Sequence, residues 1–282
     1  MIKVSVVIPA KNEQAGLSRI LPELKRIDAV NEIIVVDDGS SDDTIEVCQD
    51  NNVTCISHPY SMGNGAAIKT GVRAASCEVV VFMDADGQHQ PCEISSLLDM
   101  YKSGYDLVVG ARDSSGQASW FRHVANGIYN KFASWMTERK IRDLTSGFRV
   151  VNREKFLEFL YLLPNGFSYP TTSTMAFLRS GYSVGFKSID VLKREGKSHI
   201  NLFKDGIKFL LIIFKIATLY SPLKLFSLLS VVFSLAGGSY YLYTFITTGR
   251  FTNMGVLLLV TSVVIFLMGL ISEQISTLYY KK

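Results

Sequence analysis

Two long stretches without a charged residue lie near the C-terminus of this 282-residue chain. The first runs from Leu225 to Gly249 and the second from Phe251 to Ser272, with Arg250 between them. A helix needs about 20 apolar residues to cross the hydrocarbon core of a bilayer, so both stretches are long enough to span it. Core helices of soluble proteins rarely run this long without a charge. We therefore expect a membrane hairpin, which disfavours a purely soluble protein.

Basic residues gather on the two outer flanks of the expected hairpin. Seven lie between positions 193 and 224, and Lys281 and Lys282 close the chain, whereas the link between the spans carries Arg250. Because Lys and Arg are enriched in cytoplasmic segments, we expect an integral membrane protein with the soluble part and both termini in the cytoplasm, in the inner or plasma membrane if the host is bacterial. The net charge of +4 is too small to indicate nucleic acid, and we expect no nucleic-acid partner.

Residues 200–220 have the pattern of an amphipathic helix just before the first span. At 100° per residue, three lysines share one side and apolar residues occupy the other. The lysines are Lys204, Lys208 and Lys215, and the apolar residues are Phe203, Phe209, Leu210 and Phe214. Such a helix can lie in the headgroup layer with its lysines toward anionic lipid. The alternative is a helix that packs on the soluble domain.

The first half of the chain alternates short β-branched runs with helical patterns. Expected strands are Val4–Ile8, Ile33–Val36, Val53–Ile56, Val79–Phe82 and Leu107–Val109, and expected helices are Glu13–Ile27, Asp42–Asp50, Asn64–Ala75 and Pro91–Ser103. This alternation predicts an α/β fold with a mostly parallel, doubly wound sheet. Ligands in such folds bind beyond the carboxyl ends of the strands, and three of these ends are acidic or polar in this sequence.

The segment after the fourth expected strand carries two carboxylates, Asp84 and Asp86, separated by one residue. Such a pair can hold a hard divalent cation, because Mg²⁺ often uses one or two carboxylates together with substrate phosphates. The alternative is an Asp pair that caps the helix beginning near Pro91. The two other acidic or polar strand ends in the same sheet favour the metal site.

Two further segments have the character of a nucleotide site. After the second expected strand, Ser41, Asp42 or Asp43 can cap the next helix, which leaves Asp37 or Asp38 to accept hydrogen bonds from a base or ribose. The glycine-rich turn over residues 60–67 allows close backbone approach at a helix start, although it matches neither a Walker loop nor GxGxxG.

Five short motifs in this order resemble family 2 glycosyltransferases of the GT-A fold, and within them the dolichol-phosphate mannosyltransferase-like enzymes. The resemblance covers about residues 2–200, and the two expected spans resemble those of bacterial members. It implies a GT-A domain over residues 1–199, the amphipathic segment 200–220, and two transmembrane helices within 221–282. The motifs are Ile8-Pro9-Ala10-Lys11-Asn12-Glu13, Val35-Val36-Asp37-Asp38-Gly39-Ser40, Gly63-Asn64-Gly65-Ala66-Ala67, Asp84-Ala85-Asp86-Gly87-Gln88-His89 and Asp143-Leu144-Thr145-Ser146-Gly147-Phe148-Arg149.

The resemblance implies a nucleotide-diphosphate sugar donor and a divalent metal, Mg²⁺ or Mn²⁺. Metal-binding positions are Asp84, Asp86 and Gln88. Positions that bind the donor are Pro9, Ala10, Glu13, Val36, Asp38, Asp84, Ala85, Gln88 and Arg194. Arg194 and residues 196–199 match a late loop that closes over the donor phosphates, with His199 where Lys is usual.

The resemblance also implies an acceptor, a polyprenyl phosphate such as undecaprenyl or dolichyl phosphate. Arg112, Arg122 and Asn126 match positions that hold the acceptor phosphate, and Asn126 departs from the usual Ser. Forked guanidinium donors suit phosphate oxygens. Asp143 is the candidate if a carboxylate assists the reaction, with a structural role in the following turn as the alternative. The expected catalytic residues are thus Asp86, Asp143 and Arg122.

We expect an inverting transfer of a single sugar to the polyprenyl phosphate at the cytoplasmic membrane face. The alternatives are a processive polysaccharide synthase, which usually has more spans and a Gln-x-x-Arg-Trp segment, and a non-catalytic nucleotide-sugar-binding membrane scaffold. The sequence leaves open the sugar, the choice between UDP and GDP, and the oligomeric state, although the resemblance is compatible with a homo-oligomer.

Overall fold

The computed structural model describes residues 2–112, 120–166, 168–191, 220–250 and 252–280, with positions 214 and 218; side chains of 120–126, 279 and 280 are not described. By its internal contacts the chain divides into two compact units, Met1–Ile200 and Asn201–Lys282. The helix expected over 200–220 falls almost wholly outside the described residues, as do Arg194 and residues 196–199.

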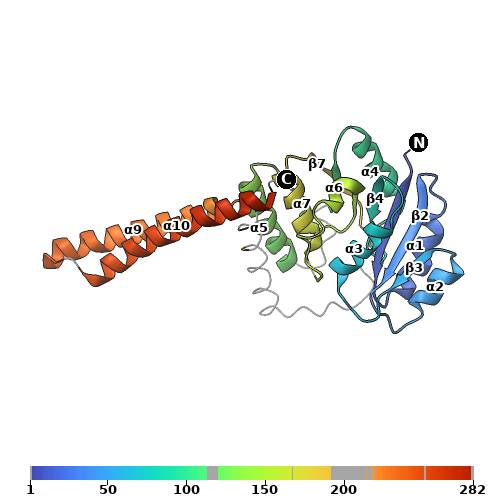
Figure 1. Cartoon of the computed structure of the whole chain (residues 1–282), viewed down its shortest axis with the longest axis horizontal. Coiled ribbons are helices and arrows are strands. Elements are labelled where there is room, and N and C mark those ends of the chain that lie inside the picture. Colours follow the sequence, from blue (N-terminus) through green and yellow to red (C-terminus); the bar gives the residue numbers. More distant parts are fainter. Residues whose placement is uncertain are drawn as a thin grey trace. The chain divides into compact units, whose positions relative to one another are not determined.

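The first unit is built on a seven-stranded sheet with the order β3-β2-β1-β4-β6-β5-β7 (Figure 1). The strands are β1 (Val4–Ala10), β2 (Val30–Asp37), β3 (Thr54–Ser57), β4 (Val79–Phe82), β5 (Leu107–Arg112), β6 (Arg149–Asn152) and β7 (Val184–Ile189). The five strands expected from the sequence correspond to β1–β5, and the α/β, mostly parallel arrangement is confirmed.

Strand β6 runs antiparallel to both of its neighbours, β4 and β5. Its first residue, Arg149, pairs with Phe82 near the carboxyl end of β4 and with Val109 of β5. Because β6 is reversed, the segment that leads into it lies at the same edge of the sheet as the carboxyl ends of its neighbours. The sequence alone gives no strand here, since Arg149 and Asn152 leave only Val150 and Val151 as apolar residues of β6.

Helices cover the two faces of the sheet. They are α1 (Gln14–Leu24), α2 (Thr44–Asp50), α3 (Asn64–Ala74), α4 (Glu93–Lys102), α5 (Trp120–Thr137), α6 (Arg153–Leu157) and α7 (Tyr169–Arg179). One face packs on α1, α2 and α4, whose buried residues join alternate β1 residues in one apolar core. The other face includes Val7, which approaches Gly71 of α3 closely, and Phe82, whose ring lies 4.8 Å from that of Phe156 in α6.

The second unit contains an antiparallel pair of long apolar helices, α9 (Pro222–Thr248) and α10 (Asn253–Tyr280) (Figure 1). Both are long and apolar enough to cross a membrane, with mean hydropathies of 1.6 and 2.7. Small residues allow close packing: a Cβ on Gly269 would lie 2.6 Å from that of Phe226. The Ser230 hydroxyl donates to the Ser262 carbonyl at 2.8 Å, and the Glu273 carboxylate accepts the Leu223 amide at 3.2 Å, near the start of α9. The expected hairpin is therefore present.

Candidate functional site

Polar residues from several elements meet at one edge of the sheet. The strands β1, β2, β4 and β5 end there, and β6 begins there because it is reversed. This edge brings together the ends of β1 and β2, residues 84–88 after β4, Arg112 at the end of β5, and residues 143–149 before and at the start of β6. The position agrees with the rule that open α/β sheets bind ligands beyond their carboxyl ends.

Residues 83–89 alternate between buried and partly exposed positions. Asp84, Asp86 and Gln88 are partly exposed, and the four residues between and beside them are buried. The Asp86 carboxylate accepts the backbone N–H of Gln88 at 3.1 Å, which holds the turn in shape. The three side chains predicted to bind metal are thus the solvent-accessible members of this segment, and all three offer oxygen donors.

Helix α1 packs directly against residues 85–87 of this segment. A Cβ on Gly16 would lie 1.9 Å from the Ala85 carbonyl oxygen, so only glycine allows the helix to pack this close. From the same helix, the Arg19 guanidinium donates a hydrogen bond to the carbonyl of Gly87, whose φ of 68° is in the left-handed region. The segment that carries the two aspartates is therefore fixed by backbone contacts that sequence reasoning did not identify.

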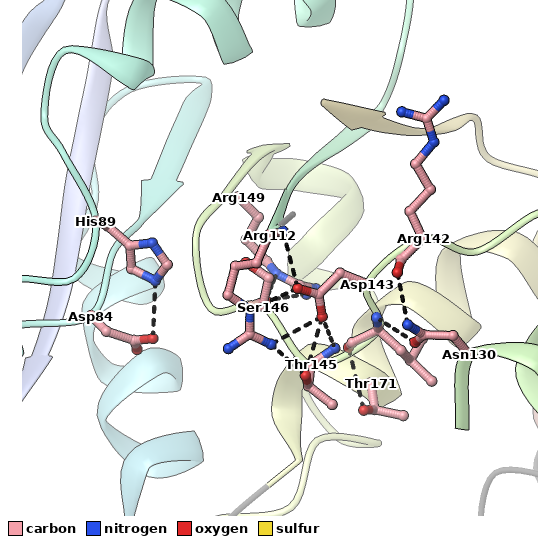
Figure 2. A network of polar contacts seen from close by, with 11 residues as sticks. Asp84, His89, Arg112, Asn130, Arg142, Asp143, Thr145, Ser146, Arg149 and Thr171 are labelled. Carbon is pink, nitrogen blue, oxygen red and sulfur yellow. Dashed lines mark hydrogen bonds and ion pairs between the residues drawn. The ribbon is translucent and has the colours of Figure 1, made fainter. Parts of the chain in front are cut away.

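Asp84 lies against both His89 and Gly147. His89 Nε2 is 3.5 Å from the carboxylate (Figure 2). The buried His89 ring stacks on Phe148 with centroids 5.0 Å apart. A Cβ on Gly147 would lie 2.4 Å from Asp84 Oδ2, so the glycine makes room for the carboxylate. Burial raises the pKa of Asp84, but His89, Arg112 and Arg149 outweigh it, so the pKa lies below its usual value.

Arg112 and Asp143 form a bidentate ion pair on the other side of the site (Figure 2). Arg112 Nε donates to Asp143 Oδ2 at 2.7 Å and Nη2 donates to Oδ1 at 3.1 Å. Nη2 also donates to the Thr145 hydroxyl at 2.6 Å. Three of the five guanidinium N–H groups are used in this way, and the two on Nη1 have no partner among the described residues.

The Asp143 carboxylate is held in its ionised form. Burial raises its pKa, yet the Arg112 guanidinium and the backbone N–H of Thr145 and of Arg112 lower it below the usual value. Its oxygens also accept from the Thr145 amide at 3.0 Å and hydroxyl at 3.1 Å. A carboxylate with a lowered pKa and several donors is a weak base. The geometry therefore favours the structural alternative for Asp143, a role in the turn at Thr145, and adds a contact that orients Arg112.

Arg149 is a fully buried cation that sequence reasoning did not assign to a role. Its guanidinium donates to the carbonyls of Ser146 (2.6 Å) and Pro170 (2.9 Å) and to the hydroxyls of Ser173 and Thr174. Burial lowers the pKa of Arg149, and the charges of Asp143 and Asp84 act in the opposite direction. A charged residue inside the apolar run Phe148 to Val151 is the signal that could have identified it.

Asp38 organises the loop over residues 58–63. Oδ1 accepts from the Met62 amide at 2.7 Å and His58 Nδ1 at 2.8 Å, and Oδ2 accepts from the Ser61 hydroxyl and the Gly63 amide, both at 2.8 Å. An ionised carboxylate has about four acceptor positions, so all are in use. A contact between Asp38 and the sugar donor stays a prediction, and it requires one of these bonds to open.

Replacing Asp38 by Asn is expected to loosen this loop and to lower the free energy of unfolding by about 2–3 kcal/mol, because an amide cannot accept from four donors. Burial raises the pKa of Asp38, but its four partners lower it below 3.8 overall. The stabilisation is therefore fully present above the unfolded pKa and is lost as the pH falls through the lower folded value. Faster hydrogen exchange at the Met62 and Gly63 amides would be the measurement, and unchanged exchange would contradict the prediction.

Two amides of the glycine-rich turn bond to a loop that lies far along the chain. Gly65 N–H donates to the Gly166 carbonyl at 3.1 Å and Ala66 N–H donates to the Asn165 carbonyl at 2.9 Å. A Cβ on Gly65 would lie 2.0 Å from the Pro164 carbonyl oxygen. The glycines of this turn thus allow the 164–166 loop to cap α3, and the suitability of the turn for a nucleotide stays a prediction.

The other predicted site residues fall into three groups. Four of them are buried where strands end at this edge of the sheet or just beyond: Pro9, Ala10, Val36 and Ala85. Glu13, in contrast, is partly exposed at the start of α1. Arg122 and Asn126 lie in α5, but their side chains are not described. Arg194 and His199 lie outside the described residues. The structure thus brings the metal-site segment and the Arg112–Asp143 pair to one edge, and the roles predicted for individual residues remain predictions.

The comparisons with known families cover both units. The family model described as glycosyl transferase family 2 matches residues 5–160, and the one described as GtrB C-terminal hairpin matches residues 221–278. The first match includes 156 of 282 positions, more than half of the chain.

Similar proteins include two with polyprenyl acceptors in their names. An undecaprenyl-phosphate 4-deoxy-4-formamido-L-arabinose transferase from Serratia proteamaculans (strain 568) is 32% identical, over 83% of this chain and 73% of that protein. A polyprenol monophosphomannose synthase from Mycolicibacterium smegmatis is 30% identical, over 67% of this chain and 77% of that protein. The glucosyl-3-phosphoglycerate synthase of Mycobacterium tuberculosis, crystallised with Mn²⁺, UDP-glucose and phosphoglyceric acid, has a TM-score of 0.62 at 21% identity and covers 77% of this chain and 79% of its own, a likeness in fold.

Proposed function

Because this chain belongs to glycosyl transferase family 2, we propose that it transfers one sugar from a UDP- or GDP-linked donor to a polyprenyl phosphate, with inversion at the anomeric carbon. Two relatives whose names state an undecaprenyl-phosphate or a polyprenol acceptor support the acceptor class. The match of residues 221–278 to a hairpin family supports a membrane-bound enzyme. In this proposal residues 1–199 carry out the transfer, and residues 200–220 and 221–282 attach it to the cytoplasmic side of the membrane.

The observation that carries the proposal is the arrangement of charge at the sheet edge. The Asp84 carboxylate lies on one side, and the Arg112 guanidinium lies on the other (Figure 2). A sugar transfer between two phosphate-containing molecules needs both features, because the donor diphosphate binds through a cation and the acceptor phosphate binds through arginine. The anomeric carbon would lie between these two subsites.

The residues at the first subsite fit a hard divalent ion. Asp84, Asp86 and Gln88 offer oxygen donors and are partly exposed, and the described residues contain no group of three or more His, Cys, Asp and Glu side chains that would form a complete protein cage. This donor set is typical of Mg²⁺ or Mn²⁺ that shares phosphate oxygens with a substrate. When bound, the ion would neutralise the charge that develops on the leaving diphosphate.

The acceptor phosphate is already a nucleophile at neutral pH, since the second pKa of a phosphate monoester is about 6. Its oxygen attacks the anomeric carbon, and the bond from that carbon to the diphosphate breaks with its electrons on the leaving nucleoside diphosphate. Asp143 fixes the plane of the Arg112 fork, and the two Nη1 donors of Arg112 face no competing partner among the described residues. We propose that Arg112, Arg122 and Asn126 hold this phosphate, so that catalysis depends mainly on positioning.

The test is direct synthesis of the lipid product. Purified full-length protein is incubated with undecaprenyl phosphate, Mg²⁺ or Mn²⁺, and a panel of UDP- and GDP-sugars. We expect one donor to give a polyprenyl-phosphate-sugar with one sugar per lipid, and the configuration at the anomeric carbon to be inverted. A polymer would instead support a processive synthase. No turnover of any donor with any lipid phosphate would support a non-catalytic scaffold.

A further inference from the structure

One side of helix α5 is buried and the opposite side is exposed. The exposed side differs from that of an ordinary solvated helix because it carries large apolar residues. Tyr129, Ala133 and Met136 are at most 2% exposed and pack into the domain. Two large apolar residues lie on the opposite side, Ile128 at 56% and Trp135 at 46% exposed, seven positions apart. Residues seven apart fall on the same side of a helix. The helix therefore presents an apolar stripe that no described part of the domain covers.

Basic residues surround this stripe. Lys131 is exposed between Ile128 and Trp135, and Arg139, Lys140 and Arg142 are exposed just beyond the end of the helix. Between residues 127 and 142 these four cations face a single acidic residue, Glu138. We call Ile128, Lys131, Trp135, Arg139, Lys140 and Arg142 the α5 outer surface.

The cationic end of this surface is held in place by the fold. The Arg142 carbonyl accepts a hydrogen bond from Asn130 Nδ2 at 2.7 Å, which ties the segment back to α5. Figure 2 shows the Arg142 side chain pointing away from the Asp143 network. Its side chain borders an open cavity of about 460 Å³ that Lys187, Asp99, Ser96 and Ser188 also line.

We propose that the α5 outer surface lies in the headgroup layer of an anionic bilayer, with Ile128 and Trp135 at the acyl boundary and the four basic residues on lipid phosphates. A Trp flanked by Lys and Arg is typical of residues at a membrane interface. The inference deepens the proposed function and rests on it in one respect: the acceptor-phosphate residues predicted there, Arg122 and Asn126, belong to the same helix. This contact would orient α5 so that a lipid acceptor reaches the site.

Charge favours lipid over the two other occupants. The segment 200–220 carries Lys204, Lys208 and Lys215, which would be repelled by the cations of the α5 outer surface. A second copy of the chain joined by a twofold axis would place the same cations opposite one another. An anionic bilayer, in contrast, complements both the apolar stripe and its basic surround.

The test uses the two tryptophans of the chain, Trp120 and Trp135. In Trp120→Phe, Trp135 becomes the sole fluorescent tryptophan. The full-length variant is placed in nanodiscs that contain equal amounts of phosphatidylcholine and phosphatidylglycerol, with or without bromine on shallow acyl carbons. We expect brominated lipid to quench Trp135 strongly, and acrylamide in the aqueous phase to quench it less than in detergent.

Two reference variants give the quenching expected with full lipid contact and with the charge of the surface reversed. Leu257→Trp on a Trp120→Phe/Trp135→Phe background places the sole tryptophan at an exposed position of α10, and it serves as the reference for full contact with lipid. Lys131→Glu/Arg139→Glu/Lys140→Glu on the Trp120→Phe background reverses the charge of the surface. We expect this variant to lose most of the quenching by brominated lipid, and the parent to lose part of it in phosphatidylcholine alone.

Two outcomes would overturn the proposal. If acrylamide quenches Trp135 as strongly in nanodiscs as in detergent, and brominated lipid does not quench it, the surface faces water. If Trp135 is shielded from acrylamide in both, with no effect of brominated lipid, a second copy or another segment of the chain covers it. Neither readout requires turnover, so the sugar-transfer assay on the same samples reports separately on the proposed function.

Discussion

Replacing Asp86 by Ala is expected to lower the rate of sugar transfer by about 10³-fold or more and to leave the protein folded. In the proposed site Asp86 supplies a carboxylate to the divalent ion that neutralises the leaving diphosphate. Its side chain is partly exposed at the sheet edge and accepts the Gln88 amide within the same turn, so truncation creates little cavity. The loss should therefore appear in catalysis and not in stability.

The measurement for Asp86→Ala is formation of lipid-linked sugar at saturating donor, with circular dichroism and thermal unfolding as checks of the fold. Binding of the nucleoside diphosphate should also lose its dependence on Mg²⁺ or Mn²⁺ concentration. Asp99→Ala is the matched control, because Asp99 is an exposed carboxylate on α4 that pairs with Lys102. Turnover of Asp86→Ala near that of Asp99→Ala would refute the metal role.

Replacing Arg112 by Ala is expected to have the second largest effect, on both activity and stability. The change removes the fork that we propose for the acceptor phosphate, and we expect kcat/KM for undecaprenyl phosphate to fall by about 10²–10³-fold. It also leaves Asp143, which is only 5% exposed, without its ion-pair partner. Because an unpaired buried charge is costly, the free energy of unfolding should fall by about 3 kcal/mol.

Replacing the other partner of this ion pair, Asp143→Ala, distinguishes an effect on the orientation of Arg112 from an effect on protein stability. The Arg112 side chain left behind is 25% exposed and can still be hydrated, so this variant should lose less stability than Arg112→Ala. It should nevertheless bind the acceptor poorly, because nothing then fixes the guanidinium. The double variant Arg112→Ala/Asp143→Ala should lose less unfolding free energy than the two single variants lose when their losses are added. The exposed Asp99–Lys102 pair provides the comparison, with an expected coupling energy of about 0–1 kcal/mol. Additive effects would show that the two side chains act independently.

The pH dependence of the same pair distinguishes a positioning role from a general base. Burial alone would raise the Asp143 pKa, but Arg112 and Thr145 lower it below 3.8, so its contribution to stability is complete above the unfolded pKa and is lost only as the pH falls through the lower folded value. Activity should therefore show no loss from Asp143 between neutral pH and pH 5. A pH profile in which Asp143→Asn removes an ionisation near neutrality would instead indicate a base.

The first part of the sheet was readable from sequence because each element there has a strong local signal. The run Val79–Phe82 is continuously apolar, Val4–Ile8 is apolar except for Ser5, and Leu17, Ile20, Leu21 and Leu24 repeat at helical spacing along α1. Strand β6 gives no comparable signal, because only Val150 and Val151 of its four residues are apolar, and it owes its place to pairing with both β4 and β5. The reversal of β6 is nevertheless what carries Asp143 to the edge where Asp84 lies.

The glycines also divide into features that local sequence shows and features that only the tertiary structure explains. Their presence in the 63–65 turn is visible in the sequence, and it was interpreted as room for a nucleotide. In the fold the room is taken by the Pro164–Gly166 loop, about 100 positions later, whose carbonyls accept the helix amides. Gly16 and Gly147 attracted no such interpretation, yet they allow α1 and the Asp143 loop to pack around the two aspartates. Local sequence shows that backbone can approach closely, but not what approaches.

The sequence by itself determined the membrane hairpin, the α/β class and the family, because apolar length, strand–helix alternation and ordered motifs are properties of contiguous residues. The tertiary structure decided how the polar groups are used: Asp38 holds the 58–63 loop, Asp143 holds Arg112, and the buried Arg149 donates to carbonyls and hydroxyls before β6 and in α7. The physical reason is that a carboxylate or guanidinium has few hydrogen-bonding positions and fills them with whichever partners the fold brings near. Those partners lie tens of residues away in the chain, where no local pattern records them.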